Sequence, residues 1–336
     1  MNLPSLKSRE EMLELLQQEE YGYLPPAVEV EVAGEEMMLK NFCAGKAVLK
    51  KVMLHCKIRE GFTFPVYCTL PTDGKKHPYF VMINFRDPVP DRYLPVEELV
   101  DRGFAVLSFC YEDVTTDDLD FKNGLAGVLF PDGRRKDTDP GKIAMWAWAA
   151  HRVRDFAETL DCLDHSCCTV CGHSRLGKTA LLAGATDERF TFAHSNDSGC
   201  SGAAITRGKR GEHIVNIATN FPFWFCKNYL KYINREEELP FDQHFLIASI
   251  APRYVSVASA EQDIWADPVA EHAACMAASP AFEAQGLPGF IGEDQPQVGK
   301  AFYEGSIGYQ LRAGTHYFSR TDWLKLMDFI ERKMNA

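Results

Sequence analysis

Residues 170–179, Val-Cys-Gly-His-Ser-Arg-Leu-Gly-Lys-Thr, contain two overlapping motifs that would do different chemistry. From Gly172 to Thr179 the pattern is G-x-x-x-x-G-K-T, the spacing of loops that bind nucleotide phosphates, and Lys178 would be the phosphate ligand. The same residues end a strand-like run with Gly-His-Ser, which is close to the G-x-S-x-G turn that exposes a nucleophilic serine. In that interpretation Ser174 does the chemistry, so the rest of the chain has to decide between a phosphate ligand and a nucleophile.

The nucleotide-binding interpretation fits the rest of the chain poorly. A phosphate loop usually follows an early strand, whereas at least five strand-like runs precede residue 170. Such a loop also needs a later apolar strand that ends in a magnesium-binding aspartate, and polar side chains interrupt the run at 190–197. A phosphate-loop nucleotide-binding protein therefore stays only as a remote alternative.

A serine hydrolase needs two further residues at defined places in the chain, and the sequence contains both. An acid and then a histidine should follow the nucleophile along the chain, each just beyond a strand. Three carboxylates follow the strand-like run 254–260, namely Glu261, Asp263 and Asp267, and His316 follows the run 307–312. The imidazole would accept the serine proton, and the carboxylate would fix its tautomer and stabilise its positive charge.

The turn around Ser174 also suits this chemistry. Gly172 permits a sharp turn before the serine, and a helix that begins near Arg175 would direct its first N–H groups toward a developing oxyanion. The motif departs from the common turn because the second glycine, Gly177, comes one position late. Lys178 lies four residues after Ser174 and hence on the same helix face, where it could reach a substrate or simply remain solvated.

Alternating strands and helices must position these residues, and they predict an α/β fold of the doubly wound kind. We expect one domain, residues 1–336, with a mostly parallel central sheet, helices on both faces and a three-layer sandwich. An aromatic-rich helical insertion at about 200–250 would cover the carboxyl edge of the sheet, where such folds bind ligands. Expected strands lie at 27–33, 47–58, 62–71, 79–85, 104–110, 169–172, 191–194, 254–259 and 307–312, and expected helices at 143–163, 176–185 and 323–333.

Composition excludes several classes of function. The chain has 336 residues, 46% of them hydrophobic and 25% charged, and a net charge of -11 that argues against a nucleic-acid or anionic-membrane partner. No run approaches the roughly 18 apolar residues of a membrane span. Residues 1–18 lack the apolar core of a signal peptide, so we expect a cytoplasmic protein with eleven reduced cysteines. The single C-x-x-C pair, Cys168 and Cys171, has no second pair at zinc-site spacing, and no metal is expected.

The residues around Ser174 resemble those of carbohydrate esterase family 15, the glucuronoyl esterases and their bacterial acetylxylan-esterase-like relatives. The family motif G-C-S-R-x-G-K stands here as Gly172-His-Ser-Arg-Leu-Gly-Lys, with His173 in place of the cysteine. Further segments between about 165 and 330 are similar to family motifs in the same order: Asn196-Asp-Ser-Gly-Cys-Ser-Gly, Arg210-Gly-Glu, Leu239-Pro-Phe-Asp-Gln-His, Asp263-Ile-Trp-Ala-Asp-Pro and Gly314-Thr-His.

The resemblance implies a single-domain α/β-hydrolase that cleaves esters on plant cell-wall polysaccharides without a metal or other cofactor. It implies that Ser174 is the nucleophile and His316 the base, and that Arg175 supports the oxyanion through its side chain and its N–H. Three residues would hold a uronic acid or a neighbouring sugar: Lys178, Glu212 and Trp265. Ring-stacking surface mixed with polar groups suits a saccharide.

The acid of the triad has two candidates. Members of the family place this carboxylate after the strand that follows the nucleophile strand, after the next strand, or at both places, which here are Asp197 and Asp263. The first position is usually glutamate in the family, so the shorter Asp197 could lie too far from His316. We favour Asp263, the ordinary α/β-hydrolase position.

The sequence thus predicts a serine esterase that acts on a small saccharide ester, with a glucuronoyl or 4-O-methyl-glucuronoyl ester as the favoured substrate. The alternative within this class is a deacetylase of acetylated xylo-oligosaccharides with the same triad. Four other residues near the motifs are expected to be structural: His173 and His194 as hydrogen-bonded imidazoles, Trp146 and Trp148 as core. For Gln243 and His244, anchoring a helix start and contacting substrate are both open.

Overall fold

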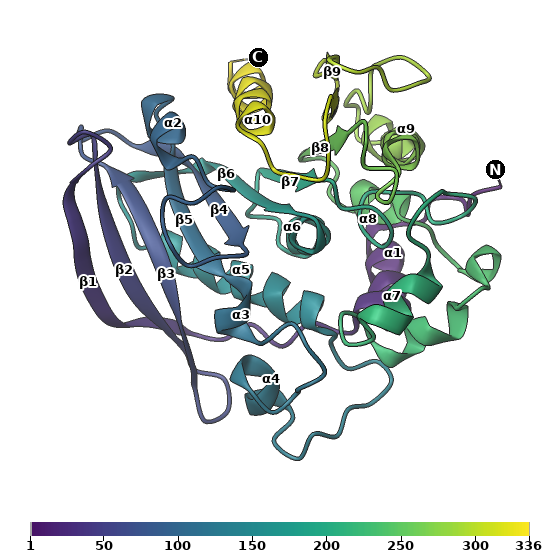
Figure 1. Cartoon of the computed structure of the whole chain (residues 1–336), viewed down its shortest axis with the longest axis horizontal. Coiled ribbons are helices and arrows are strands. Elements are labelled where there is room, and N and C mark those ends of the chain that lie inside the picture. The colour runs from purple at the N-terminus through teal and green to yellow at the C-terminus, as the bar shows by residue number, and fades with distance from the viewer. Residues whose placement is uncertain (1, 336) are drawn as a thin grey trace.

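The computed structural model describes residues 2–335, and a ten-stranded sheet runs through its middle (Figure 1). The strand order is β1-β2-β3-β5-β4-β6-β7-β8-β10-β9. Six strands that are adjacent in this order pair in parallel: β5, β4, β6, β7, β8 and β10. The strands β1, β2 and β3 at one end and the short β9 at the other pair antiparallel with their neighbours. The bounds are β1 (Val30–Phe42), β2 (Ala47–Cys56), β3 (Phe62–Pro71), β4 (His77–Asn84), β5 (Ala105–Cys110), β6 (Leu163–His173), β7 (Phe192–Asn196), β8 (Tyr254–Ala260), β9 (Ala301–Phe302) and β10 (Ile307–Arg312).

Helices cover both faces of this sheet, and each face has its own apolar core (Figure 1). Helices α5 (Lys142–Ala157) and α6 (Arg175–Thr186) pack on one face, and α2 (Val96–Asp101) and α10 (Arg320–Met334) pack on the other. Helix α5 is buried on nearly all sides, whereas α10 buries a single stripe and is capped at its start by Ser319. This arrangement is the three-layer α/β-hydrolase fold that the sequence predicts.

The remaining helical segments are mostly short. They are α1 (Arg9–Leu16), a π-helical turn η1 (Gln17–Tyr21), α3 (Tyr111–Val114), α4 (Gly124–Leu129), α7 (Ile214–Asn220), the 3-10 turns η2 (Lys227–Tyr232) and η3 (Glu236–Glu238), α8 (His244–Ala248) and α9 (Pro268–Glu283). All nine predicted strands are present, with some ends shifted by several residues. The helix predicted at 143–163 is too long, because it ends at Ala157 and β6 already begins at Leu163.

The Leu239-Pro-Phe-Asp-Gln-His segment has a structural role. Asp242 is fully buried and accepts hydrogen bonds from the Thr206 N–H at 2.7 Å and from Arg207 Nη1 at 2.9 Å. Gln243 Nε2 donates to Glu20 at 3.1 Å, and His244 Nε2 lies 3.0 Å from the Pro4 carbonyl oxygen. Of the two open roles for Gln243 and His244, the structure therefore shows anchoring: they hold the N-terminal segment against the insertion.

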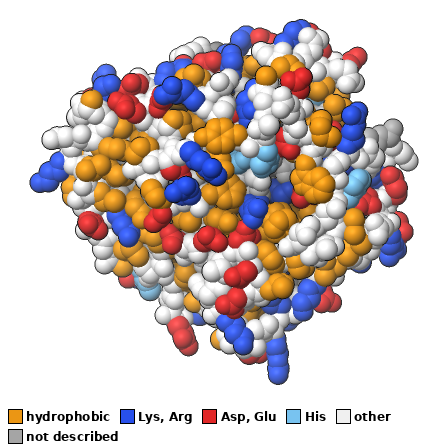
Figure 2. Space-filling model, viewed as in Figure 1, with side chains coloured by type: hydrophobic (Ala, Val, Ile, Leu, Met, Phe, Trp, Pro, Cys, Tyr) orange, Lys and Arg blue, Asp and Glu red, His pale blue; other side chains and the backbone are white. Residues whose placement is uncertain are grey.

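The surface and the thiols are unremarkable for a chain of this composition. Basic and acidic side chains are interleaved with hydrophobic ones on the face shown in Figure 2. Between residues 2 and 335 no helix combines the length and the apolar character needed to cross a membrane. All eleven cysteines are free thiols. Cys168 and Cys171 belong to the cores on opposite faces of the sheet, so this C-x-x-C pair cannot share a metal ion.

Candidate active site

Ser174 occupies the tight turn between β6 and α6. Its backbone has φ 58° and ψ -128°, a conformation that costs energy for a residue with a side chain and that clusters at functional sites. A Cβ atom at Gly172 would lie 2.2 Å from the Leu176 carbonyl oxygen, so only glycine lets the helix fold back over the strand. At Gly177 a Cβ would lie 3.0 Å from Ser195 Oγ, which shows that the late glycine provides the close contact between helix and neighbouring strand.

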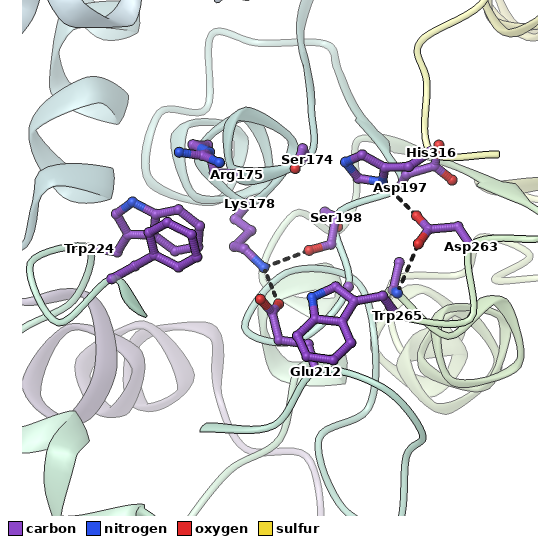
Figure 3. Close-up of a pocket in the computed structure, with 13 residues that line it drawn as sticks. Ser174, Arg175, Lys178, Asp197, Ser198, Glu212, Trp224, Asp263, Trp265 and His316 are labelled. Carbon is purple, nitrogen blue, oxygen red and sulfur yellow. Dashed lines mark hydrogen bonds and ion pairs between the residues drawn. The ribbon is translucent and has the colours of Figure 1, made fainter. Parts of the chain in front are cut away.

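His316 and Asp263 form a hydrogen-bonded pair beside Ser174. The His316 Nδ1 to Asp263 Oδ2 distance is 2.6 Å, and the imidazole lies between the serine and the carboxylate (Figure 3). Burial disfavours the charge on Asp263, but the hydrogen bond and charge of His316 outweigh it and hold the pKa of this carboxyl below its usual value. Asp263 therefore stays ionised and fixes Nδ1 as the protonated nitrogen, which leaves Nε2 to accept a proton.

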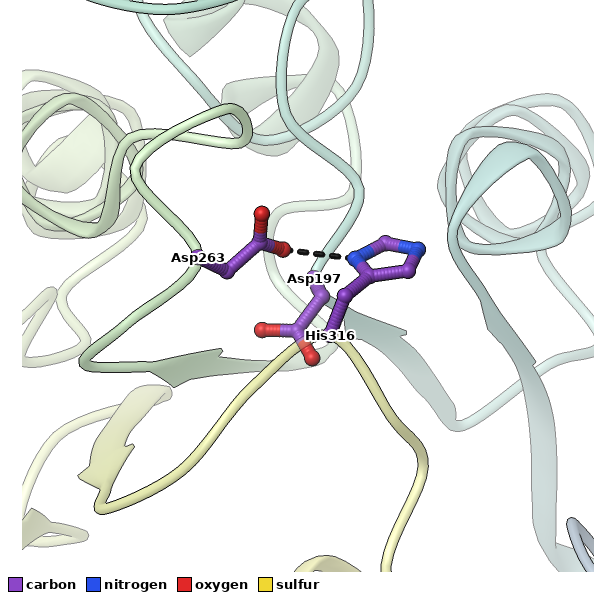
Figure 4. Close-up of side chains that lie close together, drawn as sticks. All are labelled: Asp197, Asp263 and His316. Atoms are coloured by element: carbon purple, nitrogen blue, oxygen red, sulfur yellow. Dashed lines mark hydrogen bonds and ion pairs between the residues drawn. The ribbon is translucent and has the colours of Figure 1, made fainter.

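Asp197 lies close to this pair but has other partners (Figure 4). Its Oδ1 accepts the Ala260 N–H at 2.7 Å, and its Oδ2 lies 3.3 Å from both Arg312 Nη2 and the Tyr317 nitrogen. Burial, followed by the negative charges of Glu271 and Asp263, raises its pKa well above the usual value. The hydrogen-bond geometry thus favours Asp263 over Asp197 as the partner of His316.

Arg175 begins α6, where its N–H has no partner within the helix. Its guanidinium lies over the Trp224 ring at 4.7 Å and over the Phe221 ring at 5.2 Å. These two rings are stacked, with centroids 3.9 Å apart and planes 3° apart. Nη1 donates to Asp117, a residue for which the sequence patterns gave no signal.

Lys178 is buried and bound to the protein, so it is neither a solvated helix lysine nor a free phosphate ligand. Its Nζ donates to the Ser198 carbonyl oxygen at 2.7 Å and to the Cys200 carbonyl oxygen, and it lies 3.3 Å from Glu212 Oε2. Both side chains of this ion pair are at least nine-tenths buried. The three protons of the lysine amine therefore already have acceptors within the protein.

Trp265 belongs to the loop after β8, lies beside Glu212 and is 53% exposed. A second buried lysine that the sequence analysis did not single out, Lys209, ties it to the insertion: Nζ donates to the Glu212 carbonyl oxygen at 2.8 Å and lies 3.3 Å from the Trp265 carbonyl oxygen. Gly211 has φ +71°, and a Cβ there would lie 2.5 Å from the Trp265 carbonyl oxygen. This glycine therefore allows the two loops to touch.

All these groups meet in one cavity of about 300 Å³ (Figure 3). Every site residue predicted from the sequence lines it: Ser174, Arg175, Lys178, Asp197, Glu212, Asp263, Trp265 and His316. Ser198, Gly199, Ala266 and the stacked rings of Phe221 and Trp224 complete the wall. The insertion at 200–250 thus supplies one side of the cavity and the loop after β8 supplies the other.

The two flanking histidines are structural groups. His173 is buried, its Nδ1 lies 2.6 Å from Asn196 Oδ1, and its ring centroid is 4.4 Å from that of His316. His194 is buried, with its Nδ1 3.1 Å from Ser256 Oγ. Burial lowers the pKa of each to about 3, so both stay neutral. Trp146 and Trp148 are buried in the core, as predicted.

No sequence pattern marks a further buried glutamate behind the cavity. Glu271 of α9 accepts hydrogen bonds from the Gly199 N–H at 2.8 Å and from Ser259 Oγ at 2.5 Å. It therefore joins the loop after β7 to strand β8. Burial raises its pKa to about 7. Asp267, one of the three carboxylates after β8, instead caps α9 through the Ala270 N–H.

Within residues 2–335, one group of side chains has the spacing of a metal site, and it consists of Asp197, Asp263 and His316. Its ligand atoms lie within 4.8 Å of one another (Figure 4). Their oxygen and nitrogen atoms already bind each other, backbone N–H groups and Arg312. Hydrogen bonds within the protein therefore already occupy the donor atoms of this group.

Comparison with known sequences gives consistent matches. The family described as "Glucuronyl esterase, fungi" matches residues 57–286. A carbohydrate esterase from an unknown prokaryotic organism is 37% identical over 246 residues, which are 72% of this chain and 56% of that protein. The 4-O-methyl-glucuronoyl methylesterase 1 of Wolfiporia cocos is 30% identical over 215 residues, 61% of this chain and 49% of that protein. The chain thus spans about half the length of these two curated relatives.

Solved structures match over nearly the whole chain. A promiscuous CE15 esterase from a marine bacterial metagenome superposes with a TM-score of 0.86 and 30% identity, covering 97% of this chain and 91% of that one. The glucuronoyl esterase from Solibacter usitatus superposes with a TM-score of 0.85 and 31% identity, covering 98% of this chain and 97% of that one.

Proposed function

The chain belongs to carbohydrate esterase family 15, the glucuronoyl esterases, and from this premise we propose that it hydrolyses a glucuronoyl or 4-O-methyl-glucuronoyl ester of a plant cell-wall-derived saccharide. The observation that carries the proposal is the composition of one cavity. It joins a hydrolytic group, Ser174 with the His316–Asp263 pair, to two groups suited to a sugar, Glu212 and Trp265. In such an ester the uronic acid supplies the carbonyl and an alcohol leaves.

The first half of the reaction forms an acyl-enzyme. The Ser174 hydroxyl attacks the ester carbonyl carbon while His316 Nε2 takes its proton, and Asp263 stabilises the imidazolium through Nδ1. The N–H of Arg175 and its guanidinium donate to the oxyanion, whose charge they stabilise more than that of the ground-state carbonyl. Collapse of this intermediate expels the alcohol, which receives the proton from His316.

The second half releases the saccharide acid. Water attacks the acyl group, and His316 now removes a proton from the water and returns it to Ser174. The exposed indole of Trp265 offers a ring face to the sugar. The Glu212 carboxylate offers an acceptor to its hydroxyl groups, and Lys178, which lines the same cavity, holds that carboxylate in place through their ion pair. We propose that residues 1–336 act as one domain, in which the insertion at 200–250 closes the cavity over the sheet edge.

A two-substrate turnover assay tests the proposal. We expect the wild type to hydrolyse benzyl glucuronate, and Ser174→Ala to lose about 10⁴-fold or more in kcat, since the nucleophile is gone. Ser166→Ala is the matched control, because Ser166 is an exposed serine at the start of the same strand. Acetate release from acetylated xylo-oligosaccharide without turnover of the glucuronate ester would reassign the enzyme as a deacetylase. If neither substrate reacts and a fluorophosphonate does not label Ser174, the esterase proposal is wrong.

A further inference from the structure

A buried carboxylate outside the cavity connects two residues of the cavity wall. Asp117 lies in the loop after α3, and its side chain is 7% exposed. Its Oδ2 accepts from Arg175 Nη1 and, at 3.1 Å, from the Tyr111 hydroxyl, and its Oδ1 accepts from Trp224 Nε1 at 2.7 Å. We propose that Asp117 is a positioning residue, which sets the direction of the Arg175 guanidinium toward the substrate oxyanion.

The guanidinium needs such an anchor because its other contacts are not directional. It lies over two stacked rings, Trp224 and Phe221, and stacking leaves a planar cation free to turn within its plane. Among the described residues, the bond from Nη1 to Asp117 is the one hydrogen bond that the protein gives this guanidinium. Nε is buried without a partner. One charge-assisted bond at Nη1 therefore decides where the remaining donors point.

The same carboxylate fixes the ring beneath the cation. The Trp224 N–H donates to the second oxygen of Asp117, so cation and ring are held from one point. The three residues come from a loop, from the turn after β6 and from the insertion, and no shared helix or strand would otherwise align them. Donors that are already oriented cost no reorganisation when charge develops on the substrate oxygen.

This inference rests on the proposed function, because it assigns Arg175 to the oxyanion. It predicts a kinetic signature that a purely structural aspartate would not give. Since the oxyanion exists only in the transition state, loss of the anchor should lower kcat and leave KM nearly unchanged. A loosened fold would instead lower the melting temperature and affect both constants.

The test is a double-mutant cycle on benzyl glucuronate with Asp117→Asn and Arg175→Ala. Asparagine keeps the shape of the side chain and one acceptor, and we expect kcat to fall about tenfold or more. In the Arg175→Ala background the same substitution should cost less than about twofold, because its target is absent. Asp118→Asn is the matched control: the adjacent carboxylate bonds Thr116 and Lys142 and does not line the cavity.

Two results would overturn the proposal. One is a kcat for Asp117→Asn within about twofold of wild type, and the other is an undiminished effect in the Arg175→Ala background. If Asp117→Asn does not fold, Tyr111→Phe removes one donor from the same oxygen, and it should show a smaller kcat loss that also disappears without Arg175. The same double-mutant cycle can be measured as the rate at which a fluorophosphonate labels Ser174, which needs no sugar substrate. Failure of the substrate proposal and failure of the Asp117 proposal therefore remain distinguishable.

Discussion

The loops after β7 and β8 leave neighbouring strands at the same sheet edge, and each places an aspartate near His316. The β8 loop presents its side chains to the cavity, where Asp263 binds the imidazole and Trp265 exposes its indole. The β7 loop turns its polar groups inward, with Asp197 on the Ala260 N–H and on Arg312. One loop presents the groups that the proposed function uses, and the other is hydrogen-bonded to the protein behind them.

The position of a carboxylate after a strand thus does not fix its role. Asp263 keeps a low pKa because His316 outweighs its burial. Asp197 has a raised pKa because burial, Glu271 and Asp263 together outweigh Arg312. Partners within hydrogen-bond distance, rather than place along the chain, make one carboxylate the better acid of a triad.

Of the substitutions in these two loops, replacement of Asp263 should cause the largest loss of activity. We expect Asp263→Asn to lower kcat by about 10³- to 10⁴-fold, because an amide can hold the imidazole in the wrong tautomer. Kinetics on benzyl glucuronate provide the measurement. Glu261→Gln, an exposed carboxylate in the same loop, is the control and should stay near wild type. A loss below about tenfold would mean that Asp197 supports the imidazole unaided.

Replacing Asp197 should have a smaller kinetic effect and a clearer effect on stability. Asp197→Asn leaves the catalytic pair intact but weakens the bonds to Arg312 and to the Tyr317 N–H, which hold the turn that carries His316. We expect a kcat loss of about tenfold and a loss of about 1–3 kcal/mol in the free energy of unfolding. Urea denaturation and steady-state kinetics measure the two. In an Asp263→Asn background, Asp197→Glu should recover activity, because the longer side chain can reach His316. If activity does not return, a carboxylate at position 197 cannot replace Asp263.

Removing the exposed indole should affect binding more than chemistry. We expect Trp265→Ala to raise KM for a glucuronoyl ester of a xylo-oligosaccharide about three- to tenfold, because a ring face is lost while the hydrolytic group stays in place. The same variant should label with a fluorophosphonate at the wild-type rate. A fall in labelling rate equal to the change in kcat/KM would show that the tryptophan shapes the triad instead.

The smallest effect concerns the glutamate that joins the two loops. The pKa of Glu271 is raised from 4.5 to about 7 in the folded protein, so its contribution to stability is complete below pH 4.5 and is lost as the pH rises through 7. Glu271→Gln removes this titration. We expect its melting temperature to match wild type at pH 4 and to exceed it by about 2–4 °C at pH 8.5. If the difference in melting temperature between the variant and wild type is the same at both pH values, the raised pKa is contradicted.

The elements with a regular apolar pattern, and the residues that follow a known motif order, could be predicted from the sequence. Apolar runs predicted nine of the ten strands, and the chain order of Ser174, Asp263 and His316 predicted that these side chains meet, as they do in one cavity. Helix α9 escaped because its many alanines give no strong apolar stripe. Its start is marked by Asp267, which looked like a candidate acid because the sequence does not show whether a carboxylate caps a helix or faces a cavity.

The supporting residues could not be predicted, for a physical reason. Asp117 acts on residues 58 and 107 positions away, and Lys209 acts on a carbonyl oxygen 56 positions away. Both lie in loops, where no periodicity marks the direction of a side chain. Their roles follow from tertiary contacts alone, whereas the nucleophile turn is a local motif.

The strand order has a consequence for the recovery of the native state. Asp117, Ser174, Asp263 and His316 are far apart in the chain, and His316 follows β10, which pairs with β8 in the finished sheet. Contacts between such distant segments form late, since the closure of long loops has to precede them. During refolding from denaturant, turnover should thus return after the far-ultraviolet circular dichroism signal, and it serves as a reporter of the completed sheet.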